Sequence, residues 1–236
     1  MTFDFDKIIP ICSSFIELDS TICSNLNTYG EMLLEKNKVM NLTAIVEPEE
    51  FLYKHFYDCL LFFKAYNPKI GEKIIDVGTG AGFPGVVLKI VRPDLEIHLL
   101  DSLYKRLSFL EEVGNTLKLD FKYLHLRAEQ AGCDSNFREQ YDIATSRAVA
   151  RLGVLSEYCL PLVKKGGKFI ALKGKDGDSE LIDSQNAVKL LGGSFNCVVN
   201  ENLPGGDERK IIIIDKISQT EKKYPRVGTK IAKNPL

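Results

Sequence analysis

The sequence lacks the groupings of residues that metal-binding and disulfide-rich proteins depend on. It has six cysteines and three histidines, and the cysteines are scattered, with no C-x-x-C pair and no histidine cluster beside them. Zinc sites and disulfide frameworks need such spacings. We therefore interpret the cysteines as small buried hydrophobic residues in a reducing compartment, and we predict no metal site.

Long hydrophobic runs are also missing. No apolar stretch approaches the roughly 18 residues of a membrane-spanning helix, and the first six residues (MTFDFD) include two acids where a secretory signal would carry basic residues. Hydrophobic residues make up 44% and charged residues 27% of the chain, which is ordinary for a soluble globular domain. We expect a cytoplasmic protein that makes no contact with membranes and works as a monomer.

The net charge of −1 is unevenly distributed along the chain. Residues 209–236, here called the basic segment, contain eight Lys and Arg and two acids, a local charge of +6, which leaves −7 for the first 208 residues. A basic segment on an acidic body indicates a polyanionic partner. A solvated chain end without a function explains the same charge equally well.

Residues 73–85 (KIIDVGTGAGFPG) join an apolar run to a glycine-rich turn. The run 74–77 predicts a buried parallel strand, and residues 86–91 have helical character. Pro84 suits the first position of that helix, where its missing N–H costs nothing. Strand, bare turn and helix start together predict a site for a nucleotide-like ligand, although such a turn can also be purely structural.

The spacing of the glycines narrows the ligand. Gly78, Gly80 and Gly82 permit positive φ and close approach of another molecule to the backbone, but Phe83 stands where a dinucleotide site has its third glycine. Asp76, two residues before the first glycine, is suited to a ligand with a charged amine. The pattern is similar to the first motif of Rossmann-like S-adenosylmethionine (AdoMet) methyltransferases.

Strand-like and helix-like stretches alternate after residue 68. The six further strands are predicted at 96–101, 121–126, within 141–150, and at 168–173, 194–200 and 209–216. This α/β pattern predicts a Rossmann-like methyltransferase fold with a seven-stranded, mostly parallel sheet and an antiparallel last strand. Helical periodicity between residues 8 and 65 divides the chain into an N-terminal helical cap, 1–67, and a Rossmann-like domain, 68–236, that ends in the basic segment.

Polar residues follow the predicted strands at the edge where such sheets bind ligands. Asp101 stands 23 residues after Gly78, where a carboxylate can bind a ribose or cap the next helix. Glu129 follows the third strand and suits the exocyclic amine of a base, or a surface turn. Arg147 ends the fourth strand and is placed to meet a substrate, or to form a structural ion pair.

Seven motifs occur in order and carry a closer resemblance. They are residues 37–45 (NKVMNLTAI), 55–60 (HFYDCL), 78–85 (GTGAGFPG), 101–106 (DSLYKR), 127–129 (RAE), 145–149 (TSRAV) and 222–226 (KKYPR). Through them the chain, from about residue 37 to its end, closely resembles the bacterial RsmG (GidB) family. That family transfers a methyl group from AdoMet to guanine N7 in 16S rRNA of the small ribosomal subunit.

The resemblance implies AdoMet as cofactor and 16S rRNA in the small ribosomal subunit as partner. It makes Gly78, Phe83, the Ala128–Glu129 pair and Arg147 the expected AdoMet-site positions, with Asp101 as the ribose acid. An AdoMet-dependent methyltransferase of another RNA or of a small molecule is the alternative. A nicotinamide oxidoreductase is disfavoured by Phe83, and an RNA-binding module without catalysis has no need for the acids.

Methyl transfer to guanine N7 needs no general base, because N7 has a free lone pair and no proton. We therefore expect alignment to dominate catalysis, with Arg147 orienting the guanine or a neighbouring phosphate. Binding of RNA is expected to weaken with salt, and Tyr224 is predicted to stack on a base. The predicted RNA-binding residues are Asn41, Lys173, Lys175, Arg209, Lys210, Lys222, Lys223, Arg226 and Lys230.

Overall fold

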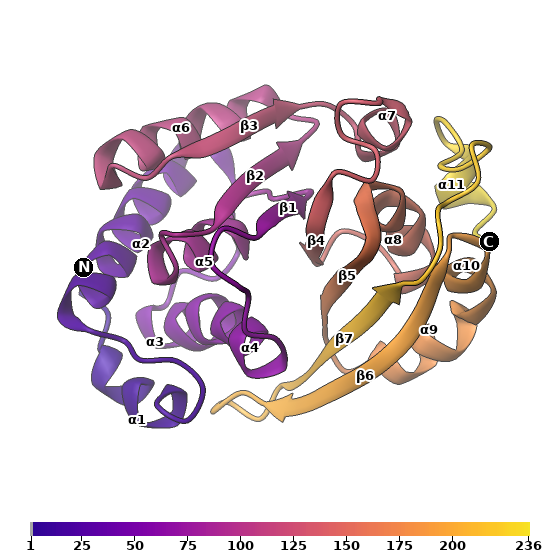
Figure 1. Cartoon of the computed structure of the whole chain (residues 1–236). Helices are drawn as coiled ribbons and strands as arrows, with labels where there is room; N and C mark the ends of the chain where they lie inside the picture. Colours follow the sequence, from indigo (N-terminus) through magenta and orange to yellow (C-terminus); the bar gives the residue numbers. More distant parts are fainter. Residues whose placement is uncertain (1) are drawn as a thin grey trace.

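The protein is described by a computed structural model that covers residues 2–236. Met1, the first residue of the predicted cap 1–67, lies outside the described residues. Seven strands form one sheet in the order β3-β2-β1-β4-β5-β7-β6 (Figure 1). The strands are β1 (Lys73–Val77), β2 (Glu96–Asp101), β3 (Phe121–His125), β4 (Tyr141–Arg147), β5 (Val163–Lys173), β6 (Gly193–Asn202) and β7 (Glu208–Lys216).

The strand directions confirm the predicted sheet. Strands β1 to β5 pair in parallel, and β7, the last strand of the chain, runs antiparallel between β5 and β6. From β1 the chain builds outward to β2 and β3 and then returns to add β4 on the other side. The strand order therefore reverses between β1 and β4, which is where open α/β sheets bind their ligands.

Helices cover both faces of the sheet (Figure 1). One face carries η1 (Phe5–Lys7), α1 (Ile9–Cys12), α2 (Ser20–Met40), α3 (Pro48–Phe51), the π-helical turn η2 (Leu52–Tyr57), α4 (Asp58–Ala65), α5 (Gly85–Val91) and α6 (Tyr104–Leu117). The other carries α7 (Ala128–Cys133), α8 (Leu152–Cys159), η3 (Leu160–Leu162), α9 (Gly177–Asp183), α10 (Gln185–Leu190) and α11 (Lys230–Lys233). Within residues 2–236, no helix combines the length and apolarity needed to cross a membrane.

Two apolar cores result, because successive side chains of a strand point to opposite faces. In β1, Ile74 packs into the core shared with α2, α4, α5 and α6, whereas Ile75 and Val77 pack into the core shared with α8. Helix α2 is tied to the turn after β1 by a hydrogen bond of 2.7 Å from Tyr29 Oη to the carbonyl oxygen of Ala81. The N-terminal helices thus share one core with the sheet, and the division at residue 67 stays a prediction.

The start of α5 differs by one residue from the predicted helix start. Helix α5 begins at Gly85, and Pro84 occupies the N-cap position. The amide of Gly85 donates to the Oδ2 atom of Asp76 at 2.9 Å. The first free N–H of the helix is therefore satisfied by a side chain of β1, which holds the turn against the strand.

Candidate active site

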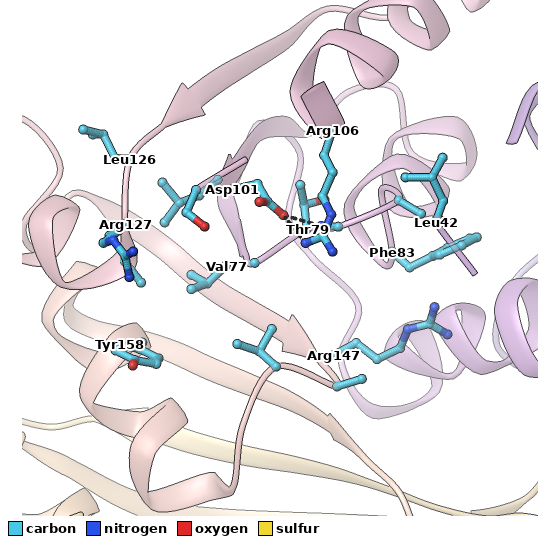
Figure 2. A pocket seen from close by; sticks show the side chains of 18 of the residues that line it. Leu42, Val77, Thr79, Phe83, Asp101, Arg106, Leu126, Arg127, Arg147 and Tyr158 are labelled. Atoms are coloured by element: carbon cyan, nitrogen blue, oxygen red, sulfur yellow. Dashed lines mark hydrogen bonds and ion pairs between the residues drawn. The ribbon is translucent and has the colours of Figure 1, made fainter. Parts of the chain in front are cut away.

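A cavity of about 540 Å³ opens at the carboxyl ends of β1, β2 and β4 (Figure 2). This volume lies in the range of roughly 300–1,000 Å³ found for small-molecule sites. Seven of the nine predicted cofactor-site residues line it: Gly78, Gly80, Phe83, Asp101, Ala128, Glu129 and Arg147. The structure therefore brings together residues that are up to 69 positions apart in the sequence (78 to 147).

The glycine loop (residues 78–84) forms one wall of the cavity with its backbone. Gly80 has φ +60°, and a Cβ atom added there would meet only the carbonyl oxygen of Gly78, at 3.9 Å. A side chain at position 80 would fill open space beside the cavity, so the glycine leaves a cradle for a ligand. Gly78 has φ +72° and allows Val149 to pack closely, since an added Cβ would lie 2.6 Å from a Val149 methyl group.

Asp76 and Gly82 support the loop from behind. The Oδ2 atom of Asp76 accepts hydrogen bonds from Thr79 Oγ1 (2.7 Å) and the Gly85 amide (2.9 Å), and burial raises the pKa of this carboxyl to about 6. A Cβ on Gly82 would lie 2.7 Å from Tyr29 Oη. Neither residue lines the cavity. Both residues therefore support the loop, and their direct contact with a ligand stays a prediction.

Two acids face the cavity from neighbouring strand ends. Asp101 is buried and anchors the glycine loop, because its Oδ2 atom accepts from the Gly80 amide at 3.0 Å. Its Oδ1 atom accepts from the Leu103 amide at 2.8 Å, before α6 begins. Glu129, in the first turn of α7, is also buried, yet its carboxylate accepts no hydrogen bond from any residue between 2 and 236. The carboxylate borders the open cavity instead, so a ligand with hydrogen-bond donors fits this end of the cavity.

Arg147 is held rigidly in the opposite wall. Its Nη1 atom donates to the carbonyl oxygen of Lys54 and to Asp58 Oδ2, both at 2.9 Å. The guanidinium also lies 4.6 Å from the centre of the Phe83 ring, a favourable cation–π distance. Arg147 therefore forms the structural ion pair that was one of the two expectations for it. The same side chain still borders the cavity (Figure 2).

His55 completes the support of Arg147. Its Nδ1 atom lies 3.0 Å from Arg147 Nη2, which can only donate, so Nδ1 is the acceptor and the proton resides on Nε2. That Nε2 atom lies 2.8 Å from Thr43 Oγ1. Burial lowers the pKa of His55 to about 3, so the imidazole is neutral. It stacks on Phe83 with ring centres 4.5 Å apart.

Sequence reasoning assigned no role to Asp58 or His55, although both stand in the motif 55–60. Their only sequence signal is a histidine and an acid inside an otherwise apolar helical stretch. That signal is weak, because the partners that define the two side chains, Arg147 and Arg209, come from β4 and β7.

Four of the predicted RNA-binding cations form ion pairs within the fold. Each is part-buried or buried and has an acid within hydrogen-bonding distance. The pairs are Lys173 with Glu180 (2.7 Å), Arg209 with Asp58 (2.9 Å), Lys210 with Asp178 (2.8 Å) and Arg226 with Glu157 (2.7 Å). Their charges are therefore engaged by the protein, and contact of these four residues with RNA stays a prediction.

The other predicted RNA-binding residues lie at the surface. Lys175, Lys222 and Lys230 are exposed and form no ion pair with residues 2–236, whereas Lys223 pairs with Glu221 at 2.8 Å. Asn41 is exposed at the C-cap of α2 with φ 49°. Tyr224 is buried against the core around α8, so the prediction that it stacks on a base is wrong.

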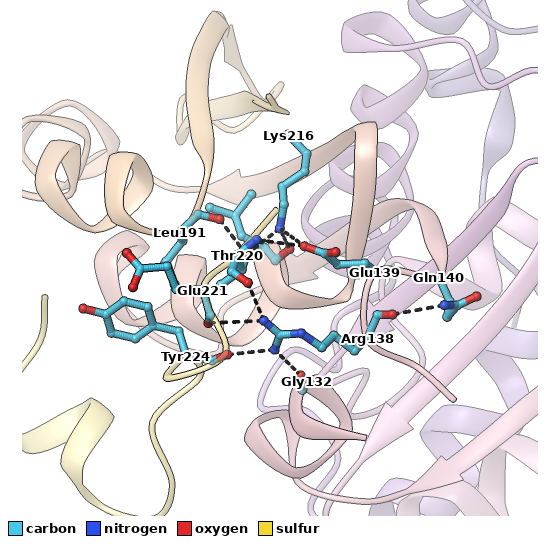
Figure 3. A network of polar contacts seen from close by, with 10 residues as sticks. Gly132, Arg138, Glu139, Gln140, Leu191, Lys216, Thr220, Glu221 and Tyr224 are labelled. Atoms are coloured by element: carbon cyan, nitrogen blue, oxygen red, sulfur yellow. Dashed lines mark hydrogen bonds and ion pairs between the residues drawn. The ribbon is translucent and has the colours of Figure 1, made fainter. Parts of the chain in front are cut away.

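The basic segment is also neither free nor frayed. Arg138 donates to the carbonyl oxygens of Thr220 (2.6 Å) and Tyr224 (2.7 Å), as Figure 3 shows. Lys216 is fully buried and donates to the Leu160 carbonyl oxygen and to Thr220 Oγ1, both at 2.5 Å. The segment is thereby fastened to the turn after α7 and to the end of α8.

The chain is similar in sequence to bacterial ribosomal RNA methyltransferases. The family model of rRNA small subunit methyltransferase G (GidB) matches residues 22–211. The ribosomal RNA small subunit methyltransferase G of Clostridium perfringens (strain 13 / Type A) is 46% identical over 235 residues, 98% of each chain. That of Alkaliphilus oremlandii (strain OhILAs) is 49% identical over 223 residues, 94% of this chain and 93% of the relative.

Solved structures resemble the fold at lower identity. TrmN from Thermus thermophilus matches with a TM-score of 0.54 and 16% identity, over 67% of this chain and 48% of that chain. At this identity the likeness shows the fold alone, and it confirms the predicted Rossmann-like architecture.

Proposed function

The chain belongs to the rRNA small subunit methyltransferase G (GidB) family, and from this premise we propose that it transfers a methyl group from AdoMet to N7 of a guanine in 16S rRNA. The observation that carries the proposal is the cavity between the bare backbone of the glycine loop and the Glu129 carboxylate, which borders the cavity without a hydrogen-bond partner among residues 2–236. We further propose that the protein acts in the cytoplasm, on the small ribosomal subunit, and as a monomer.

The residues of the cavity fit AdoMet. When bound, AdoMet supplies a methyl group on a positively charged sulfonium. Gly78 and Gly80 would let it lie against the backbone, since no side chain projects from position 80. Asp101 would accept hydrogen bonds from the ribose hydroxyls, and Glu129 with Ala128 would hold the base, whose exocyclic amine is a donor that Glu129 lacks within the protein.

Methylation of guanine N7 requires no general base from the protein. Guanine N7 has a lone pair and carries no proton, so no side chain has to remove one. His55 accordingly remains neutral and is hydrogen-bonded at both ring nitrogens. Catalysis is then mainly a matter of position, which can contribute on the order of 7–11 kcal/mol. Arg147, immobilised by Asp58 and Phe83, is the residue proposed to orient the guanine.

Mapping the modified nucleotide tests the function. Small ribosomal subunits from cells that lack this enzyme are incubated with the protein and AdoMet, and the nucleosides are identified by mass spectrometry. We expect 7-methylguanosine at one position of 16S rRNA. Methylation of another RNA, or of added small molecules only, would replace the proposal by its alternative.

Arg147→Lys tests the positioning role while keeping the charge beside Asp58. A displacement of about 1 Å can cost on the order of a hundredfold in rate, so we expect methylation to fall by about that factor while AdoMet affinity, measured by calorimetry, changes little. Arg151→Lys, at an exposed arginine paired with Asp183, is the matched control. Equal losses of AdoMet binding and methylation would assign Arg147 to the cofactor alone.

A further inference from the structure

A second cavity of about 370 Å³ adjoins the proposed cofactor cavity. His55, Arg147 and Ala148 line both cavities, so the two cavities meet at these residues, which are here called the shared wall. The second cavity lies at the carboxyl ends of β4 and β5, where Ala148 follows β4 and Gly174 follows β5. Its volume is sufficient for a small organic group, and its position places that group next to the methyl donor.

The shared wall and its surroundings offer fixed hydrogen-bond donors. Asp58 is buried and grips two arginines, with Oδ2 to Arg147 Nη1 and Oδ1 to Arg209 Nε, both at 2.9 Å. Arg209 Nη1 donates to the Glu208 carbonyl oxygen at 2.9 Å, and its Nη2 atom has no acceptor among residues 2–236. The guanidinium groups are thus immobilised without using all of their donors.

An available acceptor lies away from the shared wall. Asp176 lines only the second cavity, in the turn between β5 and α9. Its carboxylate accepts no hydrogen bond from residues 2–236, and α9 has no side-chain cap from it. The other acid of that turn is occupied, because Glu180 Oε2 accepts from the Leu152 amide (2.6 Å) and lies 2.7 Å from Lys173 Nζ.

Guanine carries the complementary set of groups. One edge has the acceptors N7 and O6, and the next has the donors N1–H and the 2-amino group. Because N7 would have to lie in direct contact with the methyl donor, the N7 edge would face the boundary with the first cavity beside Arg147, and the N1–H and 2-amino edge would then point into the second cavity. Resting on the proposed function, we propose that this cavity holds the acceptor guanine and that Asp176 accepts hydrogen bonds from its N1–H and 2-amino groups.

Inosine provides the test, because it keeps N7 and O6 but lacks the 2-amino group. 16S rRNA is transcribed with a small fraction of its guanines replaced by inosine and assembled with small-subunit proteins. After partial methylation, the ratio of 7-methylinosine to 7-methylguanosine is measured by mass spectrometry. Wild-type protein should disfavour inosine by about tenfold, the discrimination expected of one paired base edge. Asp176→Asn should lose most of this preference and bind AdoMet normally.

Asp183→Asn is the matched control, since Asp183 is an exposed acid at the other end of helix α9 and lines neither cavity. It should discriminate as the wild type does. A wild-type preference that survives in Asp176→Asn, or a wild type that methylates both bases equally, overturns the inference while the proposed function stands. A wild type that produces no 7-methylguanosine at all overturns the proposed function itself.

Discussion

The glycine loop and the basic segment use their residues in opposite ways. The loop presents bare backbone to the cavity, with Gly78 and Gly80 at positive φ and their supporting side chains behind the wall. The basic segment is rich in long charged side chains, yet it turns several of them inward, where Lys216 and Arg226 meet buried oxygen atoms. The glycine loop is open to a ligand, whereas the basic segment is bound to the rest of the fold through its charged side chains.

The difference shows that the role of a charged residue is harder to predict from the sequence than the role of a glycine. A glycine at positive φ acts through its own backbone, whatever surrounds it. A cation acts through its partner, and the partner can be an acid of the same protein as easily as a phosphate. The +6 charge of residues 209–236 is therefore a poor measure of affinity for RNA.

The largest effect is expected from removing the ion pair between Arg226 of the basic segment and Glu157 of α8. Glu157 is fully buried, and Arg226 contacts it through its backbone amide (2.8 Å), Nε (2.9 Å) and Nη2 (2.7 Å). Arg226→Ala leaves the buried carboxylate without its cation and with only the backbone amide as a donor, and breaking a buried ion pair typically costs about 3–5 kcal/mol. The free energy of unfolding, measured in urea, should fall by this amount.

Lys222→Ala is the matched control for Arg226→Ala. Lys222 is exposed and has no acidic partner within residues 2–236, so its loss should change stability by less than about 0.5 kcal/mol. If Lys222 neutralises a phosphate, its loss should reduce the salt dependence of RNA affinity by about 0.7 log units per log unit of salt. An Arg226→Ala protein with normal stability but weakened RNA binding would reverse the roles assigned to the two residues.

The next largest effect is expected from adding a side chain at Gly80. Gly80→Val places a branched side chain in the open space beside the cavity, and overfilling a fitted site typically costs about 1–3 kcal/mol. AdoMet affinity, measured by calorimetry, should therefore fall roughly 5- to 140-fold. Gly71→Val controls for backbone strain, because Gly71 has φ +74° and open surroundings but lines no cavity described above. Equal AdoMet affinity in both variants would remove the glycine loop from the cofactor site.

The smallest effect on the ligand is expected at Asp76, which supports the loop. Burial raises the pKa of Asp76 to about 6 from 3.8, so folding favours the protonated form. The stability from this group is complete below pH 3.8 and is lost as pH rises through about 6, at up to about 1 kcal/mol per pH unit. Asp76→Asn should remove this dependence, seen as a difference between the two urea-unfolding profiles, and leave AdoMet affinity within about twofold. A large loss of AdoMet affinity would indicate that Asp76 contacts the ligand directly.

Much of the fold was predictable because its signals are local. The strand ending at Asp101 was predicted with its observed bounds, 96–101, since an apolar run followed by an acid and a helix is a pattern within one stretch of chain. The helix start near Pro84 was off by one residue, because the bond from the Gly85 amide to Asp76 joins two elements. The buried state of Tyr224 was missed for a similar reason, because it depends on a core and a hydrogen-bond partner, Arg138, that are distant in the sequence.

The sequence by itself determined the bare turn after β1, the acids at the ends of the next strands and the family to which they point. Each depends on residue type and short spacing, which constrain the backbone directly. Only the tertiary structure decided where the cations go: Arg209 meets Asp58 across 151 positions, and Arg226 meets Glu157 across 69. The physical reason is that a charge interacts with whatever lies within a few ångströms of it, and folding alone sets those distances.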